Sequence, residues 1–507
     1  MKPAHISVNP SFPVGPVRRR TFGSFVEHLG RCVYGGIYEP SHPSADAQGF
    51  REDVAQLTRE LGVSTVRYPG GNFVSNYRWE DGVGPVDERP ARIDLAWHCT
   101  EPNTVGVDEF MAWARKVGVE PMMAVNLGTR GVAEAVDLLE YCNVPGGTAR
   151  SDQRIANGTR DPHRIGMWCL GNEMDGPWQT GHKTPQEYAR LAAETARAMR
   201  QVQPDLELVA CGSSGSGMDT FGAWELEVLK EAYQQVDYIS AHEYYWESDG
   251  DLASFLASGV KMDRFIKAVV ALCDAARAVG KHDKHINISF DEWNVWYMHA
   301  RASSPPTGDD WPVAPRLLED NYHVADAVVV GDLLITLLNN TDRVHAASLA
   351  QLVNVIAPIM TEPGGRAWKQ TTFHPFALTS AHAAGQVLRC AVDCPEVQTA
   401  QLGLVPALGA VATWDKEAGA LTVFATNRST ADALPLTVDV DACAQACGGL
   451  RLVEAVSFSN PDPYWKASAL DDSSVLPAAN ASAHMQAGQL QVTLPPVSWT
   501  MLRLAQA

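Results

Sequence analysis

Two glutamates stand at the ends of apolar runs and are the strongest candidates for chemistry in this 507-residue chain. Glu173 follows the run IGMWCLGN, and Glu292 ends the run INISFDE. A carboxyl group directly after a buried strand can project from the end of a sheet, where burial and a second nearby carboxylate raise its pKa. Two carboxyl groups, one protonated and one ionised, are the groups that glycoside hydrolysis requires.

The spacing of the two glutamates supports a joint role. They are 119 residues apart, which is about three repeats of a strand and a helix. In an eight-stranded barrel they would follow strands 4 and 7, and their side chains could converge across the mouth. A single glutamate after a strand is more often the N-cap or first-turn residue of the next helix. The hypothesis therefore depends on the pair.

The first two thirds of the chain alternate between short β-branched runs and longer segments with helical periodicity. This alternating pattern predicts a (β/α)8 barrel over residues 20–385. A doubly wound sheet is the competing interpretation, but the early glycine pairs Gly35-Gly36 and Gly70-Gly71 have no phosphate-loop spacing. The predicted strands are 21–26, 64–68, 120–126, 165–170, 207–211, 238–242, 286–291 and 346–353. The predicted helices are 50–61, 107–117, 133–142, 185–202, 223–234, 262–279 and 324–339.

From residue 386 the pattern changes to short alternating runs separated by turn formers. Such runs predict a β-sandwich of jelly-roll type over residues 386–507. The strand-like start of the chain, 5–8, predicts that residues 1–19 add a strand to this second domain. The predicted strands are 387–390, 411–414, 421–426, 434–440, 450–457 and 490–494.

Other predicted barrel strands also end in polar residues. Glu27 follows the first strand, Asn72 the second and His242 ends the sixth, while Gln351 falls in the eighth. Arg67, in the second, is expected to hold the acids of the mouth rather than to contact a ligand. Carboxylates and amides with few cations favour a neutral polyhydroxylated ligand over a phosphate.

The charge balance excludes several classes of partner. The chain has 59 acidic and 40 basic residues and a formal net charge of −19. This charge argues against a nucleic-acid or membrane partner. The start of the chain has no apolar segment typical of a secretory signal, and the most apolar helical stretch, 324–338, is too short to span a bilayer.

The ten cysteines give no sign of a metal site. Cys390 and Cys394, like Cys443 and Cys447, are four residues apart, without the Cys-x-x-Cys spacing or nearby histidines of a zinc site. We therefore expect reduced thiols in a cytoplasmic protein that uses no metal.

Six blocks in the barrel region resemble one known family. They are FGSFVEHLG (22–30), RYPGGN (67–72), WHCTE (97–101), WCLGNEMDGPW (168–178), HEYY (242–245) and FDEWNVWY (290–297). In these blocks and in their order, the chain resembles the intracellular α-L-arabinofuranosidases of glycoside hydrolase family 51. The resemblance extends over essentially the full chain and includes the C-terminal β-sandwich.

The resemblance implies a role for each matching residue. Glu173 would be the acid/base and Glu292 the nucleophile of a retaining double displacement that needs no cofactor. Tyr244 would orient the nucleophile, with His242 beside it. The other residues implied to bind substrate are Glu27, Asn72, Asn172 and Gln351 around the furanose, Trp296 as its apolar wall, and Trp97 and Trp178 on the leaving-group side.

The resemblance also implies a substrate and an assembly. The chain would release terminal non-reducing α-L-arabinofuranosyl residues from arabino-oligosaccharides, such as hemicellulose or pectin fragments, and would form a homo-oligomer, commonly a hexamer. One alternative is an endo-β-glucanase or a xylosidase on the same barrel. A non-catalytic sugar-binding protein is more remote, because degenerate barrels usually lose a catalytic carboxylate and both are present here.

Overall fold

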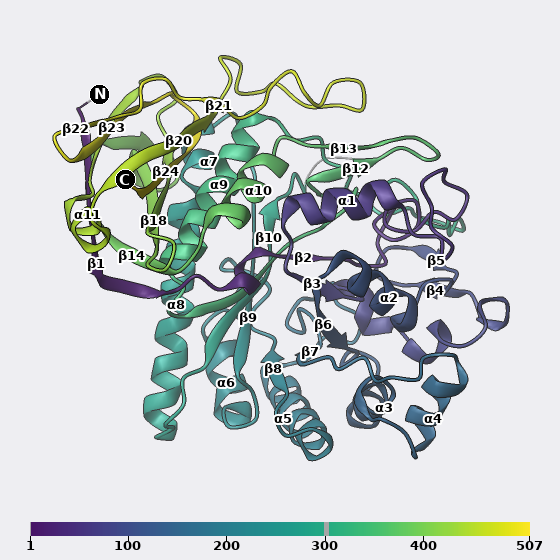
Figure 1. Ribbon diagram of the computed structural model, residues 1–507. Helices are drawn as coiled ribbons and strands as arrows, with labels where there is room; N and C mark the ends of the chain where they lie inside the picture. The colour runs from purple at the N-terminus through teal and green to yellow at the C-terminus, as the bar shows by residue number, and fades with distance from the viewer. Residues whose placement is uncertain (1, 299–303) are drawn as a thin grey trace.

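The core of the molecule is a closed barrel of eight parallel strands (Figure 1). The computed structural model describes residues 2–298 and 304–507. Every barrel strand overlaps one of the eight predicted runs, which confirms the predicted barrel. In chain order the strands are β2 (Gly23–Phe25), β3 (Thr65–Tyr68), β6 (Glu120–Val125), β7 (Met167–Leu170), β8 (Glu207–Ala210), β9 (Tyr238–Tyr245), β10 (Asn287–Val295) and β11 (Val344–Leu349).

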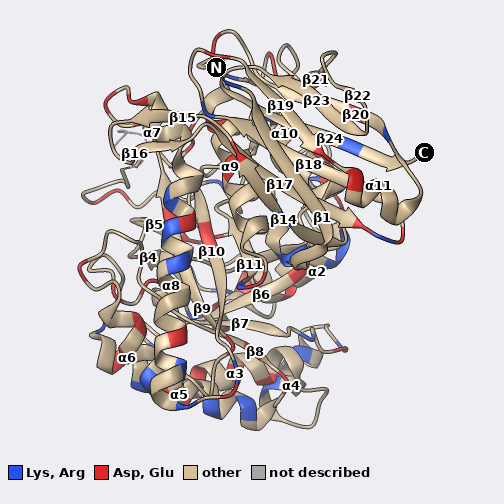
Figure 2. Cartoon of the chain, turned by 90° about the vertical axis from the view of Figure 1, so that its left-hand side faces the viewer, with Lys and Arg blue, Asp and Glu red and all other residues tan. Residues whose placement is uncertain are grey.

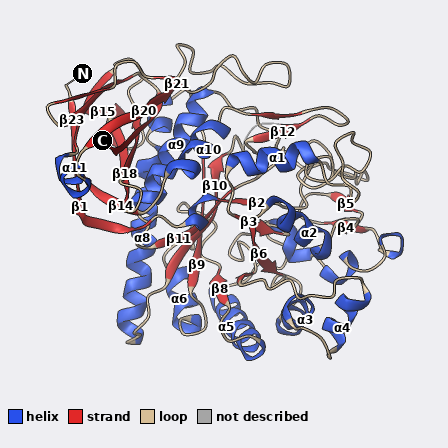
Figure 3. Cartoon of the chain, viewed as in Figure 1, coloured by secondary structure: helices blue, strands red, loops and turns tan. Residues whose placement is uncertain are grey.

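A helix follows each barrel strand, and the helices surround the barrel (Figure 3). The predicted limits of three of them agree with the structure at both ends. In one of these, Thr184 caps the helix by accepting the backbone N–H of Glu187 at 3.3 Å, and Pro185 occupies the first helical position. The eight helices are α1 (Glu52–Leu61), α2 (Val107–Val117), α3 (Val132–Asn143), α5 (Pro185–Val202), α6 (Ala223–Ala232), α8 (Ser258–Gly280), α9 (Val324–Asn339) and α10 (Phe373–His382); α4 (Ala149–Ala156) and α7 (Leu252–Leu256) are additional.

The C-terminal part forms a sheet of ten strands in the order β21-β20-β24-β18-β17-β14-β1-β19-β23-β22. The chain start belongs to it, because β1 pairs antiparallel with β14 and parallel with β19. The strands are β1 (Ala4–Pro16), β14 (Gln386–Asp393), β17 (Leu408–Asp415), β18 (Ala420–Asn427), β19 (Leu434–Asp439), β20 (Leu450–Phe458), β21 (Ala478–Ala479), β22 (His484–Gln486), β23 (Gln489–Leu494) and β24 (Ser498–Gln506).

This sheet folds over on itself around a core of its own. Ile6 of β1 and Val492 of β23 share one apolar cluster with Val423 of β18 and Leu502 of β24, from the other half of the sheet. Two faces that pack in this way make a β-sandwich, as predicted. The short helix α11 (Asp441–Cys447) lies beside β1 and β20. The boundary placed between residues 385 and 386 stays a prediction.

Helix α9 joins the two parts of the molecule (Figure 1). Its residues from Val324 to Leu338 are all buried, because the barrel covers one side and strands β17, β18 and β24 cover the other. Gly331 permits this approach, since a Cβ atom there would lie 2.3 Å from the ring of Trp499. None of the described helices is long and apolar enough to cross a membrane.

Small hairpins and mixed surface charge complete the fold. The hairpins are β4 (Arg92–Asp94) with β5 (Cys99–Glu101), β12 (Ile359–Thr361) with β13 (Ala367–Lys369), and β15 (Glu396–Thr399) with β16 (Gly403–Pro406). Figure 2 shows acidic and basic residues interspersed along outer helices such as α5 and α8. All ten cysteines lie among the described residues and carry free thiols.

Candidate active site

The carboxyl ends of the barrel strands surround a cavity of about 520 Å³. Glu173 comes three residues after β7, the fourth strand of the barrel, and Glu292 lies within β10, the seventh, which continues past the predicted end at residue 291. His242 contacts Glu173, and Asn172 contacts Arg67; neither residue lines the cavity. The predicted residues that line the cavity itself are Glu27, Asn72, Trp97, Glu173, Trp178, Tyr244, Glu292, Trp296 and Gln351.

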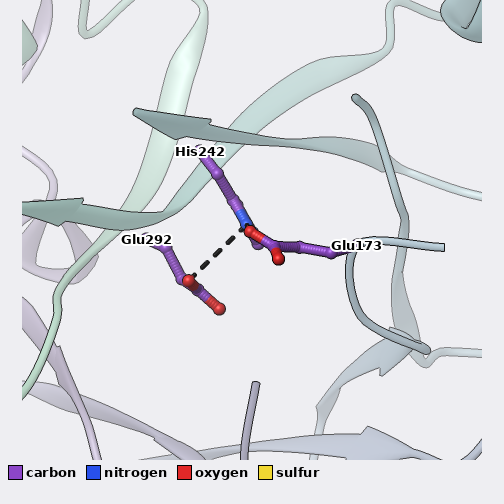
Figure 4. A group of neighbouring side chains, drawn as sticks. All are labelled: Glu173, His242 and Glu292. Atoms are coloured by element: carbon purple, nitrogen blue, oxygen red, sulfur yellow. Dashed lines mark hydrogen bonds and ion pairs between the residues drawn. The ribbon is translucent and has the colours of Figure 1, made fainter. Parts of the chain in front are cut away.

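Glu173 is held by a histidine on one side and a tryptophan on the other. Figure 4 shows Glu173 beside His242, with Glu292 on the other side of that ring. Its Oε1 lies 2.9 Å from Nδ1 of His242, and its Oε2 accepts the indole N–H of Trp178 at 2.8 Å. The Glu173 backbone has a φ of 45°, a strained conformation for a residue other than glycine. Burial raises the pKa of Glu173, and the charge of Glu292 adds to the rise although His242 opposes it. A raised pKa suits a general acid.

Glu292 is held by two hydrogen-bond donors. Arg67 donates to its Oε1 at 2.7 Å, and the hydroxyl of Tyr244 donates to its Oε2 at 2.8 Å. Both donors stabilise negative charge on the carboxylate, as a nucleophile requires. The expected contact of Arg67 with the acids is therefore present. Trp296 packs edge-on against Tyr244, with ring centroids 5.0 Å apart, and forms part of the cavity wall.

The separation of the two carboxyl groups decides which reaction geometry fits. A carboxyl oxygen of Glu173 and one of Glu292 lie within 4.8 Å of each other. Retaining glycosidases place the two groups about 5–5.5 Å apart, whereas inverting enzymes need about 6.5–9.5 Å to admit a water molecule. An approach of two carboxyl oxygens to within 4.8 Å fits the closer spacing of a retaining pair.

The pKa of His242 is raised by the acids around it. Burial acts to lower its pKa, but the charge of Glu292 and hydrogen bonds to Asp291 and Glu173 outweigh burial and raise the pKa to about 10. Asp291 was not predicted from the sequence to be a site residue, because neighbouring residues of a regular strand point to opposite faces. The one feature of the sequence that pointed to Asp291 was its position directly before Glu292 at the end of the run INISFDE.

Glu27 lies in a polar part of the cavity wall. It accepts the backbone N–H of Phe73 at 2.9 Å, the indole N–H of Trp97 at 3.0 Å and the amide N–H of Gln351 at 3.0 Å. Burial raises the pKa of Glu27 to about 8, with a contribution from the charge of Glu292. Gln351 lies two residues beyond the end of β11, so the eighth strand is shorter than predicted.

The remaining predicted residues take two kinds of position. Asn172 accepts a hydrogen bond from Arg67 at 2.6 Å and donates to Asn72 at 3.3 Å, which links strands 2 and 4. Trp178 stands half-exposed at the mouth beside Glu173. Trp97 donates its indole N–H to Glu27 in the cavity wall, and its place on the leaving-group side stays a prediction.

Glu173, His242 and Glu292 also have the donor types of a metal site, and their donor atoms lie within 4.8 Å of one another. Both ring nitrogens of His242 already contact carboxyl groups, and Arg67 and Tyr244 already hold Glu292. A metal ion would have to displace these hydrogen bonds. We therefore interpret the group as an acid–base cluster.

Comparison with family models gives two matches that cover most of the chain. The α-L-arabinofuranosidase 1 domain matches residues 57–262. The α-L-arabinofuranosidase C-terminal domain matches residues 291–498. The first match contains Glu173 and the second contains Glu292, so each model covers one of the two acids.

Curated relatives and solved structures agree with these models. An intracellular exo-α-(1→5)-L-arabinofuranosidase of Streptomyces lividans is 57% identical over 100% of this chain and 76% of its own length. An exo-α-(1→6)-L-arabinofuranosidase of Bifidobacterium longum is 54% identical over 99% of this chain and 98% of its own.

A family 51 α-L-arabinofuranosidase structure from Bifidobacterium longum shares 50% identity and superposes with a TM-score of 0.95, covering 99% of this chain and 100% of that one. The Thermotoga maritima α-L-arabinofuranosidase in complex with arabinose shares 33% identity with a TM-score of 0.86, covering 99% of each chain. These matches extend over the barrel, the sandwich and the paired acids together. The chain belongs to the α-L-arabinofuranosidases of glycoside hydrolase family 51.

Proposed function

We propose that this protein is a retaining exo-α-L-arabinofuranosidase that acts inside the cell on arabino-oligosaccharides. The observation that carries the proposal is the pair Glu173 and Glu292, whose carboxyl oxygens lie within 4.8 Å at the mouth of the barrel. Names of relatives support the exo action, and several of these relatives are named intracellular.

The reaction proceeds in two displacements. Glu292 attacks the anomeric carbon while Glu173 gives its proton to the departing oxygen. Glu173 then takes a proton from water, and the water oxygen displaces Glu292 and releases arabinose. Trp178, at the open side beside Glu173, would meet the leaving group. Glu27, Gln351 and Asn72 would hold the furanose hydroxyls at the inner end of the cavity.

Stereochemistry and substrate range test the proposal together. Time-resolved proton NMR of 4-nitrophenyl α-L-arabinofuranoside hydrolysis should show the α-anomer of arabinose first. The β-anomer as first product would overturn the retaining mechanism. A panel of α-1,5- and α-1,6-linked arabino-oligosaccharides should lose one terminal arabinose at a time.

The alternatives are tested with the same panel. Glucan and xylan fragments should be poor substrates, and preferential cleavage of a soluble β-glucan would favour the endo-glucanase instead. The comparisons do not favour it: a bifunctional glucanase-xylanase shares 13% identity with this chain, which shows the fold alone. The homo-oligomer, commonly a hexamer, stays a prediction, which analytical ultracentrifugation of the purified chain would test.

A further inference from the structure

Asp291 is a buried carboxylate that neither step of the reaction uses. It is 1% exposed, and its Oδ1 lies 2.8 Å from Nε2 of His242. The other ring nitrogen of that histidine, Nδ1, lies 2.9 Å from Glu173. His242 is therefore held between the acid/base and a second carboxyl group that never meets the substrate.

A bulge in β10 makes this arrangement possible. Ser289 pairs with Ser240 of β9, but Glu292 pairs with His242, so three steps along β10 correspond to two along β9. A β-bulge of this kind changes the direction of side chains and is common beside active sites. Here it lets two consecutive residues of one strand reach His242: Asp291 contacts Nε2 at 2.8 Å and Glu292 lies 3.7 Å from Nδ1.

The contacts leave one proton to be shared between His242 and Glu173. When the proton is on Nδ1, the imidazolium donates to both carboxylates. When it is on Glu173, the neutral ring accepts at Nδ1 and still donates its Nε2 proton to Asp291. Asp291 accepts from Nε2 in both states. It thereby determines which nitrogen faces Glu173.

We propose that Asp291 is a positioning residue for the acid/base: through His242, its charge retains the proton that His242 and Glu173 share. The inference rests on the proposed glycosidase function. In the first step this proton leaves the Glu173 carboxyl for the glycosidic oxygen as the carbon–oxygen bond breaks. In the second step water returns a proton to Glu173. Asp291 forms and breaks no bond in either step, and acts only through its position against Nε2 of His242.

No other group that the structure describes around Asp291 could replace its negative charge beside Nε2 of His242. Burial raises the pKa of Cys211 to about 12, so that thiol is neutral. Cys169 only approaches Oδ2 at 3.8 Å, and Arg67 already holds Glu292. Among the described residues, no other carboxyl group is hydrogen-bonded to Nε2 of His242. The groups that face Asp291 are Arg67 of β3, Cys169 of β7, Cys211 next to β8, His242 of β9, and Ser289 and Glu292 of β10.

The test is the pH dependence of kcat/KM in the full-length Asp291→Asn variant. An aryl α-L-arabinofuranoside with a poor leaving group and one with an activated leaving group are compared. Without the negative charge of Asp291, His242 and Glu173 should lose their shared proton more readily. The alkaline limb of the kcat/KM profile should therefore move to lower pH by about one unit or more. The loss at neutral pH should be larger for the poor leaving group, which needs protonation.

Ser289→Ala is the matched control. It removes the 3.2 Å hydrogen bond from Ser289 to Asp291 but keeps the charge, so its alkaline limb should remain in place. A uniform loss in Asp291→Asn, with the limb unmoved and both substrates affected equally, would overturn the inference. If circular dichroism shows that Asp291→Asn is unfolded, Asp291→Ser carries the same expectation.

The two proposals fail in different ways. An unaltered chain that hydrolyses neither aryl arabinofuranoside contradicts the proposed function. An active unaltered chain whose Asp291 variants keep the original alkaline limb contradicts only the role of Asp291.

Discussion

Two buried ionic clusters in this molecule use similar residues for opposite purposes. One lies at the barrel mouth around Glu173 and Glu292. The other lies where α9 meets the C-terminal sheet: Asp332 accepts hydrogen bonds from Arg428 at 2.9 Å and from the hydroxyl of Thr426 at 2.6 Å. A cavity of about 760 Å³ opens beside this second cluster, so cavity size alone does not identify the active site.

The difference lies in how completely each cluster is paired. In the second, Arg428 uses Nε and both terminal nitrogens, two of them on Asp332 and the third on the carbonyls of Pro406 and Leu408. In the first, three carboxyl groups surround Arg67 and His242, and the pKa values of Glu173 and His242 are displaced. In the second cluster, the paired Asp332 and Arg428 connect α9 to the C-terminal sheet. In the first, the excess of carboxyl groups leaves a proton that can move between Glu173 and His242.

The largest expected effect is the loss of turnover in Glu292→Ala. Without the nucleophile no covalent intermediate forms, and kcat on aryl α-L-arabinofuranosides should fall by at least about 10³-fold. Azide should restore activity with an inverted product, measured by NMR. Unchanged turnover in the folded variant would remove Glu292 from the chemistry.

Glu173→Ala should discriminate between leaving groups. General acid catalysis contributes about 10²–10⁴-fold, so substrates with poor leaving groups should lose that much of kcat/KM while activated aryl substrates lose far less. A series of substituted phenyl arabinofuranosides measures the dependence. Equal losses across the series would contradict the acid/base role.

Arg428→Met should affect stability and leave the site chemistry alone. Asp332 would remain buried without its partner, and breaking such a pair costs about 3–5 kcal/mol. Urea unfolding measures the loss. Thr426→Val removes one hydrogen bond from the same carboxylate and should cost only about 1 kcal/mol. A variant that stays stable but loses kcat would show that the two clusters are coupled.

A further expected effect, confined to one pH range, is a pH dependence of stability that comes from Glu27. Its pKa rises from 4.5 to about 8 in the folded state, so the folded state binds the proton more tightly. This contribution is fully present below pH 4.5 and is lost as the pH rises through about 8. Relative to Glu27→Gln, the unaltered chain should therefore lose unfolding free energy between pH 4.5 and 8. Glu88→Gln, at an exposed carboxylate, should leave the profile unchanged.

The barrel could be predicted because its strands are short apolar runs and a segment with helical periodicity follows each of the first seven; helix α10, after the eighth, was not predicted. Strand β24 (Ser498–Gln506) could not be predicted, although it is an interior strand of the C-terminal sheet. Residues Ser498 to Leu502 are all buried, since neighbouring strands and α9 cover both faces, and no alternation marks such a strand. The β4–β5 hairpin was missed as well, because its three-residue strands are too short to show a period.

The sequence by itself determined the class of the fold and the two acids, because periodicity and the residue at the end of a strand are local properties. Only the tertiary structure decided that the acids come within 4.8 Å, that His242 lies between Glu173 and Asp291, and that Arg67 is paired with Glu292. The physical reason is that barrel closure sets the distances between strands, and one bulge in β10 sets the directions of Asp291 and Glu292.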